Sequence, residues 1–319
     1  MGKQLYVKDI QAGDKIIETF LVKEKNLAYS QKGAPYLNLR LNDKTGVVEA
    51  KVWDNATECD PLFKKGDIIQ IKARAVSYKN TLQLSIVDIR KALPEEIDMA
   101  DYLPTAREDG DSMLKDLAGY VDSIKDPHLL ALLQSFFEDD EIRNRFKTAP
   151  AAKGFHHVYL GGLLEHTLSV VRMLDMASNH YQGLNRDLII TGGILHDLGK
   201  IYEFNYDRTI DYSDEGRLIG HIVMGAEMVS ARIAALPSFP AQLAMELKHL
   251  ILSHHGMLEY GSPKLPNTVE AMMVHMMDDL DAKVNAFQEY IKASPSDESS
   301  WTPYHKLFDR YIYKGPGSH

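Results

Sequence analysis

Cysteine and long hydrophobic runs are nearly absent from this sequence. Cys59 is the only cysteine among 319 residues, so no disulfide can form within one chain, which is compatible with a reducing compartment. No apolar stretch reaches the roughly 18 to 20 residues that a membrane helix needs. Residues 1–5 lack the apolar core of a secretory signal. We therefore expect a cytoplasmic protein that does not enter a membrane.

Positive charge is also scarce, but it is unevenly distributed. The net charge is −9, yet residues 1–90 carry 15 Lys and Arg against 11 Asp and Glu, a balance of +4. The rest of the chain carries 21 against 34, a balance of −13. A basic N-terminal part could hold an anionic polymer, and an acidic body could hold cations. The alternative is that a net charge of +4 over residues 1–90 is too small to indicate any binding function.

The residue pattern predicts two domains. Residues 1–90 contain short runs that alternate with period two, separated by turn residues, which predicts a small β barrel. The expected strands are 36–41, 47–53, 68–76 and 82–87. Residues 91–110 are rich in proline and acidic residues and are expected to be a linker with little structure. Apolar residues at spacings of three and four then predict an all-α domain over 111–313, followed by a disordered tail at 314–319.

An adjacent His-Asp pair ends one of the predicted helices. The segment 192–200 reads Gly-Gly-Ile-Leu-His-Asp-Leu-Gly-Lys, with the pair at His196 and Asp197 and with Gly199 expected as a left-handed helix stop. Polar side chains at a buried helix end need partners or a metal ion. Such a dipeptide is a weak signal by itself.

Two further polar residues lie on helix faces that should point inward. His166 shares a face with Leu163 and Val170, and Asp278 shares one with Val274 and Asp281. A single inward histidine is more often a core residue than a ligand. A carboxylate on an inward face, however, is costly unless a cation or hydrogen bonds compensate it. Together with the His-Asp pair, these residues would supply four ligands.

Three more histidines lie where loops meet predicted helices. His221 follows a glycine and opens a helix, and His254 and His255 close another. If these helix ends converge, seven ligands hold two ions bridged by Asp197. A mixed imidazole–carboxylate set suits Mn²⁺, Fe²⁺ or Zn²⁺ better than Mg²⁺. We expect a divalent metal cofactor, with Mn²⁺ favoured and Fe²⁺, Zn²⁺, Ni²⁺ or Mg²⁺ as alternatives.

These motifs, in this order, resemble the HD-domain metal-dependent phosphohydrolases. The sequence around them is similar to the YhaM-type bacterial 3′→5′ exoribonucleases, most clearly at Gly161–Thr167, Gly220–Ile222 and Ser253–Gly256. The resemblance covers residues 10–310. It implies an N-terminal OB-fold barrel, an HD domain, and shortening of single-stranded RNA from its 3′ end to nucleoside monophosphates, usually with Mn²⁺. The family's metal residues carry over onto His166, His196, Asp197, Asp278, His221, His254 and His255.

Other residues near these motifs are candidates for the reaction itself. Water activated by the ions would attack phosphorus, with Asp197 at the centre, so no side-chain nucleophile is required. Lys200 could neutralise a phosphate oxygen, or could merely favour a helix C-terminus. Lys153, His156 and His157 could grip the terminal phosphate or ribose, or could form an ordinary surface loop. We expect His249 and His275 to support the ligands or to fill the core.

The barrel offers candidates for binding a single strand of RNA, with single-stranded DNA as an alternative ligand. Aromatic residues would stack on bases and basic residues would lie near the phosphates. The stacking candidates are Tyr36, Trp53 and Tyr78, and the basic ones are Arg40, Lys51 and Lys72. The alternative is that Tyr36 and Trp53 fill or flank the barrel core.

Two other functions remain open on the sequence. The first is an HD phosphohydrolase of nucleotides or short oligonucleotides. The second is a DNA-binding OB-fold protein with a non-catalytic metal site. The HD-GYP cyclic-dinucleotide phosphodiesterases lose support because the residues after His255 read Gly-Met-Leu-Glu-Tyr-Gly-Ser-Pro, without their continuation. The sequence does not predict an oligomeric state.

Overall fold

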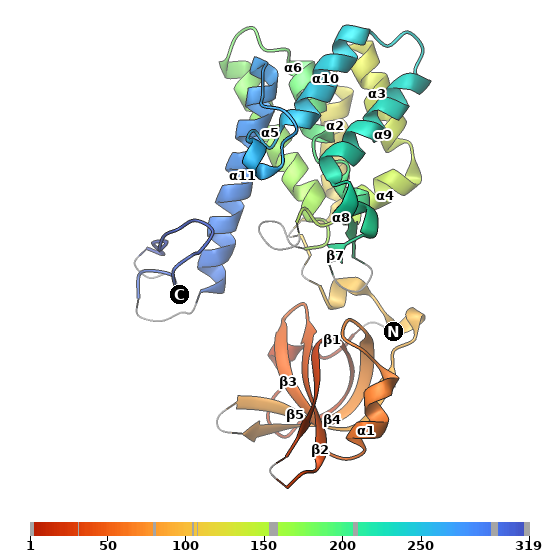
Figure 1. Cartoon of the computed structure of the whole chain (residues 1–319), viewed down its shortest axis with the longest axis vertical. Helices are drawn as coiled ribbons and strands as arrows, with labels where there is room; N and C mark the ends of the chain where they lie inside the picture. The colour runs from red at the N-terminus through yellow and green to blue at the C-terminus, as the bar shows by residue number, and fades with distance from the viewer. Residues whose placement is uncertain are drawn as a thin grey trace. The chain divides into compact units, whose positions relative to one another are not determined.

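The chain folds into two compact units (Figure 1). The computed structural model describes residues 3–30, 32–78, 81–103, 105–106, 108–152, 159–206, 210–294 and 299–315. One unit comprises Met1–Thr105 with Asn205–Ile210, and the other comprises Ala106–Phe204 with Asp211–His319. Among the described residues, no helix is both long enough and apolar enough to cross a membrane.

The first unit is a closed five-stranded barrel with the strand order β1-β2-β3-β5-β4. Its strands are β1 (Lys15–Tyr29), β2 (Pro35–Asp43), β3 (Gly46–Val52), β4 (Ile68–Tyr78) and β5 (Thr81–Lys91). All neighbours pair antiparallel except β3 and β5, which are parallel. The alternation that predicted β2 is realised, since Leu37, Leu39 and Leu41 are fully buried. This barrel is an OB fold, as expected.

The sequence pattern did not predict β1. Phe20, Leu21 and Val22 are buried in succession, which interrupts the period-two alternation. The reason is that β1 pairs with β4 through its first half and with β2 through its second, with a register shift between Val22 and Glu24. The barrel is completed by η1 (Val7–Asp9), α1 (Ala56–Cys59) and η2 (Asp60–Leu62).

The segment after β5 has more structure than the expected linker. It forms η3 (Pro94–Glu96) and η4 (Met99–Asp101), and it packs on the barrel. Asp101 accepts a hydrogen bond from Tyr6 Oη at 2.6 Å, and the buried Tyr102 hydroxyl lies 2.6 Å from Thr19 Oγ1. Asp101 and Glu96 therefore pair with barrel groups, Asp101 with Tyr6 and Lys44 and Glu96 with Arg90. The exact domain limits stay a prediction.

The second unit is helical, as predicted for an HD domain. Its helices are α2 (Gly110–Asp122), α3 (Pro127–Phe137), α4 (Asp140–Thr148), α5 (Gly162–His180), α6 (Arg186–Leu195), α7 (Lys200–Glu203), α8 (Asp214–Leu218), α9 (His221–Ala235), α10 (Ala241–Ser253), η5 (Leu258–Tyr260) and α11 (Val269–Ala293). Phe204 and β7 (Asp211–Tyr212) of this unit belong to a short two-stranded ribbon, in which β6 (Phe204–Asn205) pairs with β7. Asp109, Asp126 and Asp139 cap α2, α3 and α4 by accepting first-turn N–H groups.

Helix α6 lies at the centre of this unit, with every residue from Leu188 to Leu195 buried. Two glycines allow its neighbours to approach. A Cβ on Gly192 would lie 2.4 Å from Leu250 of α10, and a Cβ on Gly193 would lie 2.5 Å from Leu174 of α5. This packing places the end of α6, and the His-Asp pair that follows it, deep in the unit.

Candidate metal centre

The His-Asp pair joins α6 to α7 and is almost fully buried. His196 Nδ1 lies 2.8 Å from the Gly193 carbonyl oxygen, so this nitrogen donates and Nε2 points into the unit. The expected left-handed stop at Gly199 is wrong, because its φ is −58°. Glycine is needed there for another reason: a Cβ would lie 2.1 Å from the His221 carbonyl oxygen. Gly199 thus lets α9 approach the pair closely.

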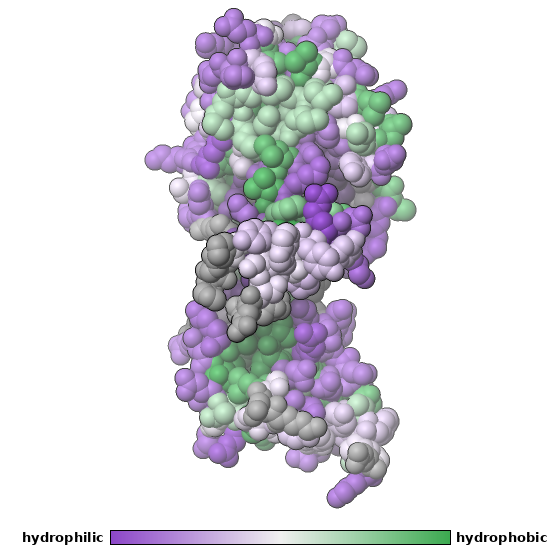
Figure 2. Space-filling view, turned by 90° about the vertical axis from the view of Figure 1, so that its left-hand side faces the viewer, coloured by the Kyte–Doolittle hydropathy of each residue, from purple (hydrophilic) through white to green (hydrophobic). Residues whose placement is uncertain are grey.

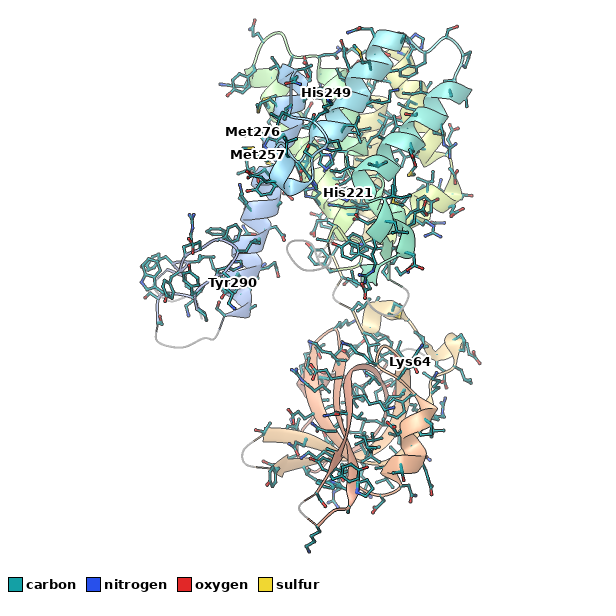
Figure 3. All side chains as sticks on the ribbon, in the orientation of Figure 1. Lys64, His221, His249, Met257, Met276 and Tyr290 are labelled. Carbon is teal, nitrogen blue, oxygen red and sulfur yellow. The ribbon has the colours of Figure 1, made fainter. Side chains whose placement is uncertain are left out.

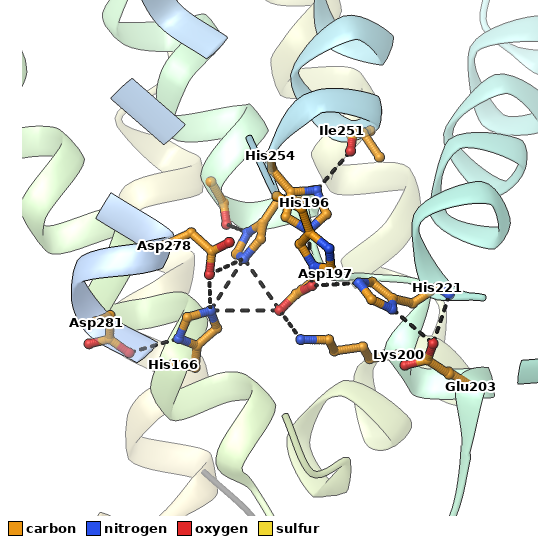
Figure 4. Close-up of polar contacts among 12 residues, drawn as sticks. His166, His196, Asp197, Lys200, Glu203, His221, Ile251, His254, Asp278 and Asp281 are labelled. Atoms are coloured by element: carbon orange, nitrogen blue, oxygen red, sulfur yellow. Dashed lines mark hydrogen bonds and ion pairs between the residues drawn. The ribbon is translucent and has the colours of Figure 1, made fainter. Parts of the chain in front are cut away.

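Four side chains from three parts of the fold meet around His166 of α5 (Figure 4). Its Nε2 lies 3.2 Å from Asp278 Oδ1, 3.3 Å from His196 Nε2 and 3.6 Å from Asp197 Oδ2. His196 Nε2 lies 3.4 Å from the same Asp197 oxygen. Two imidazole nitrogens and two carboxylate oxygens therefore converge on one point, as the four-ligand prediction requires.

Three further histidines meet on the other side of Asp197. His221 opens α9, and His254 and His255 follow α10. One ring nitrogen of each lies within 4.8 Å of the others. The second oxygen of Asp197, Oδ1, is 3.5 Å from Nε2 of His221 and 3.5 Å from Nε2 of His254. Asp197 thus presents one oxygen to each group, which is the arrangement expected of a bridging ligand.

Three polar atoms around the second group of histidines lack hydrogen-bond partners. Asp197 Oδ1, His221 Nε2 and His254 Nε2 are buried and make no hydrogen bond within the described residues. A buried polar atom without a partner costs about 1–3 kcal/mol, and a charged one costs more. A divalent cation among these atoms would satisfy all three at once. The assignment of the seven residues as metal ligands stays a prediction.

Hydrogen bonds behind the rings orient them toward this centre. His254 Nδ1 lies 2.7 Å from the Ile251 carbonyl oxygen, and His255 Nδ1 lies 2.8 Å from that of Tyr260. His221 Nδ1 lies 2.8 Å from Glu203 Oε1. These partners place the proton on Nδ1 and leave Nε2 free to ligate, which is the usual arrangement behind metal-binding histidines.

Two carboxylates that hydrogen-bond to the Nδ1 atoms of these histidines were not assigned from the sequence. Asp281 Oδ2 lies 2.7 Å from His166 Nδ1, and Ser169 donates to its other oxygen. Its spacing of three residues from Asp278 on one helix face was the available signal. Glu203 follows the His-Asp pair on the short helix α7, and no periodicity marks it. Glu203 becomes recognisable only when the helices are assembled.

The two supporting histidines differ in what they contact. His275 is buried, and its Nδ1 lies 2.7 Å from the His254 carbonyl oxygen, so it supports the turn that carries the paired histidines. His249 Nε2 instead accepts a hydrogen bond from the Asn267 N–H at 2.9 Å, which fastens the segment before α11. Lys153, His156 and His157 lie outside the described residues.

The electrostatic field of the site attracts positive charge. Burial alone would lower the pKa of His166, yet Asp278 and Asp281 raise it to about 9. Burial likewise opposes the charge of Lys200, but Asp197 and Asp278 raise its pKa, and its Nζ lies 2.6 Å from Asp197 Oδ2. By contrast, burial with His254 and His221 lowers the pKa of His255 to about 3, which keeps that ring neutral.

On the barrel, three of the predicted nucleic-acid contacts form one cluster. The rings of Tyr36 and Trp53 are stacked, with centroids 4.8 Å apart, and Lys51 Nζ lies 5.6 and 5.4 Å from the two centroids. Trp53 is 50% exposed, so it does not fill the core. This aromatic platform lies on β2 and the end of β3, on the strands that OB folds commonly use for oligonucleotides.

Two of the other three barrel candidates form ion pairs with carboxylates of the barrel. Arg40 pairs with Glu24 at 2.9 Å, and Lys72 pairs with Asp88 at 3.0 Å. Tyr78, at the end of β4, is 55% exposed. Their roles in binding stay predictions.

An OB barrel followed by helices that gather these histidines and aspartates defines the class of HD-domain proteins with an OB-fold domain. Comparison with known proteins agrees: a family model for the HD domain matches residues 163–283, and a model for an OB-fold nucleic acid binding domain matches residues 21–92. The 3′-5′ exoribonuclease YhaM of Geobacillus sp. (strain WCH70) is 32% identical over 95% of this chain and 93% of its own length. The chain belongs to the YhaM family of 3′-5′ exoribonucleases.

Solved structures align with a smaller part of the chain. A domain of replication protein A from Methanococcus maripaludis is 18% identical and covers 28% of this chain and 94% of its own, with a TM-score of 0.25. The mitochondrial single-stranded DNA binding protein Rim1 of S. cerevisiae is 20% identical and covers 26% of this chain and 97% of its own, with a TM-score of 0.21. These alignments are too limited to bear on function.

Proposed function

We propose that this chain is a metal-dependent 3′→5′ exoribonuclease that hydrolyses single-stranded RNA to nucleoside monophosphates. The observation that carries the proposal is Asp197, whose two carboxylate oxygens face separate groups of buried ligand atoms. The relative's name supplies the substrate and the direction of cleavage. Single-stranded DNA is the alternative substrate, since stacked rings and a lysine recognise bases and phosphates that RNA and DNA share.

The centre would hold two divalent cations, with His166, His196 and Asp278 on one side of Asp197 and the three other histidines on the opposite side. Such ions lower the pKa of water and neutralise the charge that develops on a phosphate. Mn²⁺ is the preferred candidate because imidazole and carboxylate ligands are mixed, and Fe²⁺, Zn²⁺, Ni²⁺ and Mg²⁺ are alternatives.

The protein side chains have separate tasks around these ions. Asp281 and Glu203 hold the rings of His166 and His221 in place. Lys200 keeps its proton beside Asp197, and it thereby offsets part of the negative charge that two buried aspartates place in the site. Its ammonium group is therefore committed to Asp197, and a contact between Lys200 and a phosphate is secondary in our proposal.

The aromatic platform of the barrel would add affinity for the strand to that of the metal centre. Stacking of a base on an aromatic side chain contributes about 1–3 kcal/mol and tolerates any base. Lys51 lies beside both rings and would meet the backbone phosphates. Such binding favours repeated cleavage of the same strand.

The proposal is tested on purified protein supplied with Mn²⁺. We would compare single-stranded RNA labelled at its 5′ end, the same RNA labelled at its 3′ end, and single-stranded DNA of equal sequence. A 3′→5′ exonuclease gives a ladder of shortening products from the 5′-labelled strand and releases labelled mononucleotide at once from the 3′-labelled one. The RNA and DNA rates decide the substrate preference.

A matched pair of histidine variants tests whether cleavage depends on the metal centre. His196→Ala should abolish cleavage, whereas His180→Ala, at the exposed end of α5, should leave it unchanged. Cleavage of mononucleotides or cyclic dinucleotides without cleavage of RNA would instead support a nucleotide phosphohydrolase. Retained RNA binding with no hydrolysis at any metal concentration would support a non-catalytic metal site.

A further inference from the structure

Helix α11 is apolar on two opposite sides. Its inner side is buried against the helical unit through Ala271, Val274, Ala282 and Ala286. Its outer side carries five large apolar residues, which we call the outer stripe. These residues are Val269, Met272, Met276, Leu280 and Val284, and they are 65, 41, 47, 46 and 46% exposed. A helix that is apolar all round is normally covered on every side, so this stripe indicates a missing neighbour.

A folded hairpin extends the same surface at the end of α11 (Figure 3). Residues 300–314 double back, with bridges between Trp301 and Tyr313 and between His305 and Arg310. The hairpin is fastened to α11 by ring contacts, at 4.5 Å between Phe287 and Phe308 and at 4.3 Å between Tyr290 and His305. The Lys314 N–H donates to the Ser300 carbonyl oxygen at 2.8 Å, so the chain is ordered into the predicted tail.

The outer face of this hairpin is aromatic. Trp301 and Tyr313 lie 5.1 Å apart, as ring centroids, and Tyr304 and Tyr311 lie 5.2 Å apart. All four are between 44 and 59% exposed, although Thr302 and Ile312 on the inner face are buried. Half-exposed, four aromatic side chains offer roughly 300–500 Å² of contact area, given about 150–250 Å² for each when fully buried. Figure 2 looks onto this side of the helical unit and shows green, hydrophobic residues gathered in one area and bordered by purple, hydrophilic ones.

We propose that the outer stripe and the aromatic hairpin together form a two-fold interface with a second copy of this chain. A stable interface needs about 800 Å² from each partner, and the hairpin supplies about half of that before the stripe is added. Interface cores are enriched in Met, Tyr, Trp and Arg, which is the composition found here. The side chains of the outer stripe form a ridge along α11. In a two-fold pair, the ridge of one helix packs into the groove beside the ridge of the other, so the same surface serves both copies.

An antiparallel pairing of the two α11 helices covers both ends of the surface. Helix α11 has 25 residues, or about 37 Å, with the hairpin at its C-terminal end. Beside its N-terminal end, Met257 and Leu265 are 52 and 46% exposed. The hairpin of one copy would therefore meet these residues of the other. A two-fold axis that crosses the outer stripe at the level of residue 281 would also place Asp279 opposite Lys283 of the partner subunit, so the charges that pair within one chain are complementary between chains as well.

Nucleic acid fits this surface less well. The hairpin has Lys306 and Arg310, which would meet phosphates, but along the outer stripe the cation is Lys283, and it already pairs with Asp279 at 2.6 Å. A strand bound to the hairpin would leave the stripe uncovered. A second copy covers both, which is why it is the occupant that we propose.

The test measures the mass of the full chain in solution by light scattering or sedimentation. We expect about twice the chain mass of 36.0 kDa at micromolar concentration. The double variant Met276→Glu with Leu280→Glu should give the mass of one chain. A control double variant, Leu218→Glu with Met245→Glu, changes apolar residues of α8 and α10 that are even more exposed, and it should remain dimeric. Thermal unfolding of all three proteins checks that the substitutions do not unfold the chain.

A cysteine placed on the proposed axis gives a second measurement. In a Cys59→Ser background, Leu280→Cys should form a disulfide between two chains on mild oxidation, whereas Leu218→Cys should not. A wild-type chain that is monomeric throughout, or a dimer that the α11 double variant leaves intact, would overturn the proposal. So would a monomer in which Trp301→Ala weakens RNA binding, because that result assigns the hairpin to nucleic acid.

Discussion

Glu203 and His221 are joined by two hydrogen bonds through a single carboxylate oxygen. Oε1 of Glu203 lies 2.8 Å from His221 Nδ1 and 3.0 Å from the His221 backbone nitrogen. The first bond fixes the rotation of the ring, and the second holds the first residue of α9. Glu203 therefore positions the His221 Nε2 that faces Asp197.

Glu203→Ala should weaken metal binding at the His221 side of the centre. Loss of such an outer partner typically lowers metal affinity by about 10–100-fold. Metal titration by calorimetry should show one site weakened and the other nearly unchanged, and excess metal should restore most of the activity. Glu215→Ala, an exposed acidic change on α8, is the control and should bind metal normally. Equal weakening of both sites would contradict a role confined to His221.

Asp281→Asn should act in the same way on the opposite side. Asp281 keeps the proton of His166 on Nδ1, and an asparagine can present its NH₂ group instead, which favours the wrong tautomer. We expect metal affinity about 10–100-fold lower at this side. Asp279→Asn lies two residues away, where Asp279 pairs with Lys283 on the surface, and should have no effect. A variant of Asp281 that binds metal as wild type does would exclude this role.

The site residues that were predicted from the sequence are those that helical periodicity places on an inward face. His166 and Asp278 stand on inward helix faces, so their convergence followed from 3.6 residues per turn. Glu203 and Ser169 were not predicted, because their roles depend on how α5, α7, α9 and α11 are placed in space. Gly199 shows the same limit: its position after the His-Asp pair suggested a helix stop, while its actual role is set by contact with α9, which comes later in the chain.

The same reasoning applies to the fold. Strands β2 to β5 were predicted because their alternation is regular. Strand β1 was not predicted, since a strand shared between two neighbours buries residues on both faces near Phe20 and Val22. Similarly, the segment near Asp101 appeared to be a linker because a local pattern does not show that its carboxylate would meet Tyr6 and Lys44.

Gly199→Ala should disturb the centre without touching a ligand. The added Cβ would lie 2.1 Å from the His221 carbonyl oxygen, so α9 must move away and carry His221 with it. We expect destabilisation of about 1–3 kcal/mol, as for overpacked cores, and lower metal affinity at the His221 side. Gly119→Ala in α2 has open space around the new Cβ and should be neutral or slightly stabilising. Denaturant unfolding measures both, and equal stabilities would contradict the contact.

Lys3 should make the stability of the barrel depend on pH. Burial lowers its pKa to about 8 despite Glu18 and Asp43, from 10.5 in an unfolded chain. Between these values the unfolded state binds more protons, so stability rises with pH from about 8 to 10.5 and is lowest below pH 8. After discounting for solvent screening we expect about 1–2 kcal/mol across this window. Lys3→Met should remove this rise. Urea unfolding at pH 8 and pH 10 measures it, and an equal change in unfolding free energy in the wild type and the variant would contradict the role of Lys3.

Trp53→Ala should weaken the binding of long strands more than it slows the chemistry. The indole stacks on Tyr36 and half of it is exposed, so its removal takes away a base-stacking surface and leaves the barrel core intact. A loss of about 1–3 kcal/mol corresponds to a roughly 5–150-fold rise in KM for long RNA. The rate on a dinucleotide, whose cleavage needs only the metal centre, should not change. Tyr29→Ala, another exposed aromatic change in β1, is the control. Equal losses on long and short substrates would mean that the substitution acts on the catalytic unit, and the barrel would then have no separate role in holding the strand.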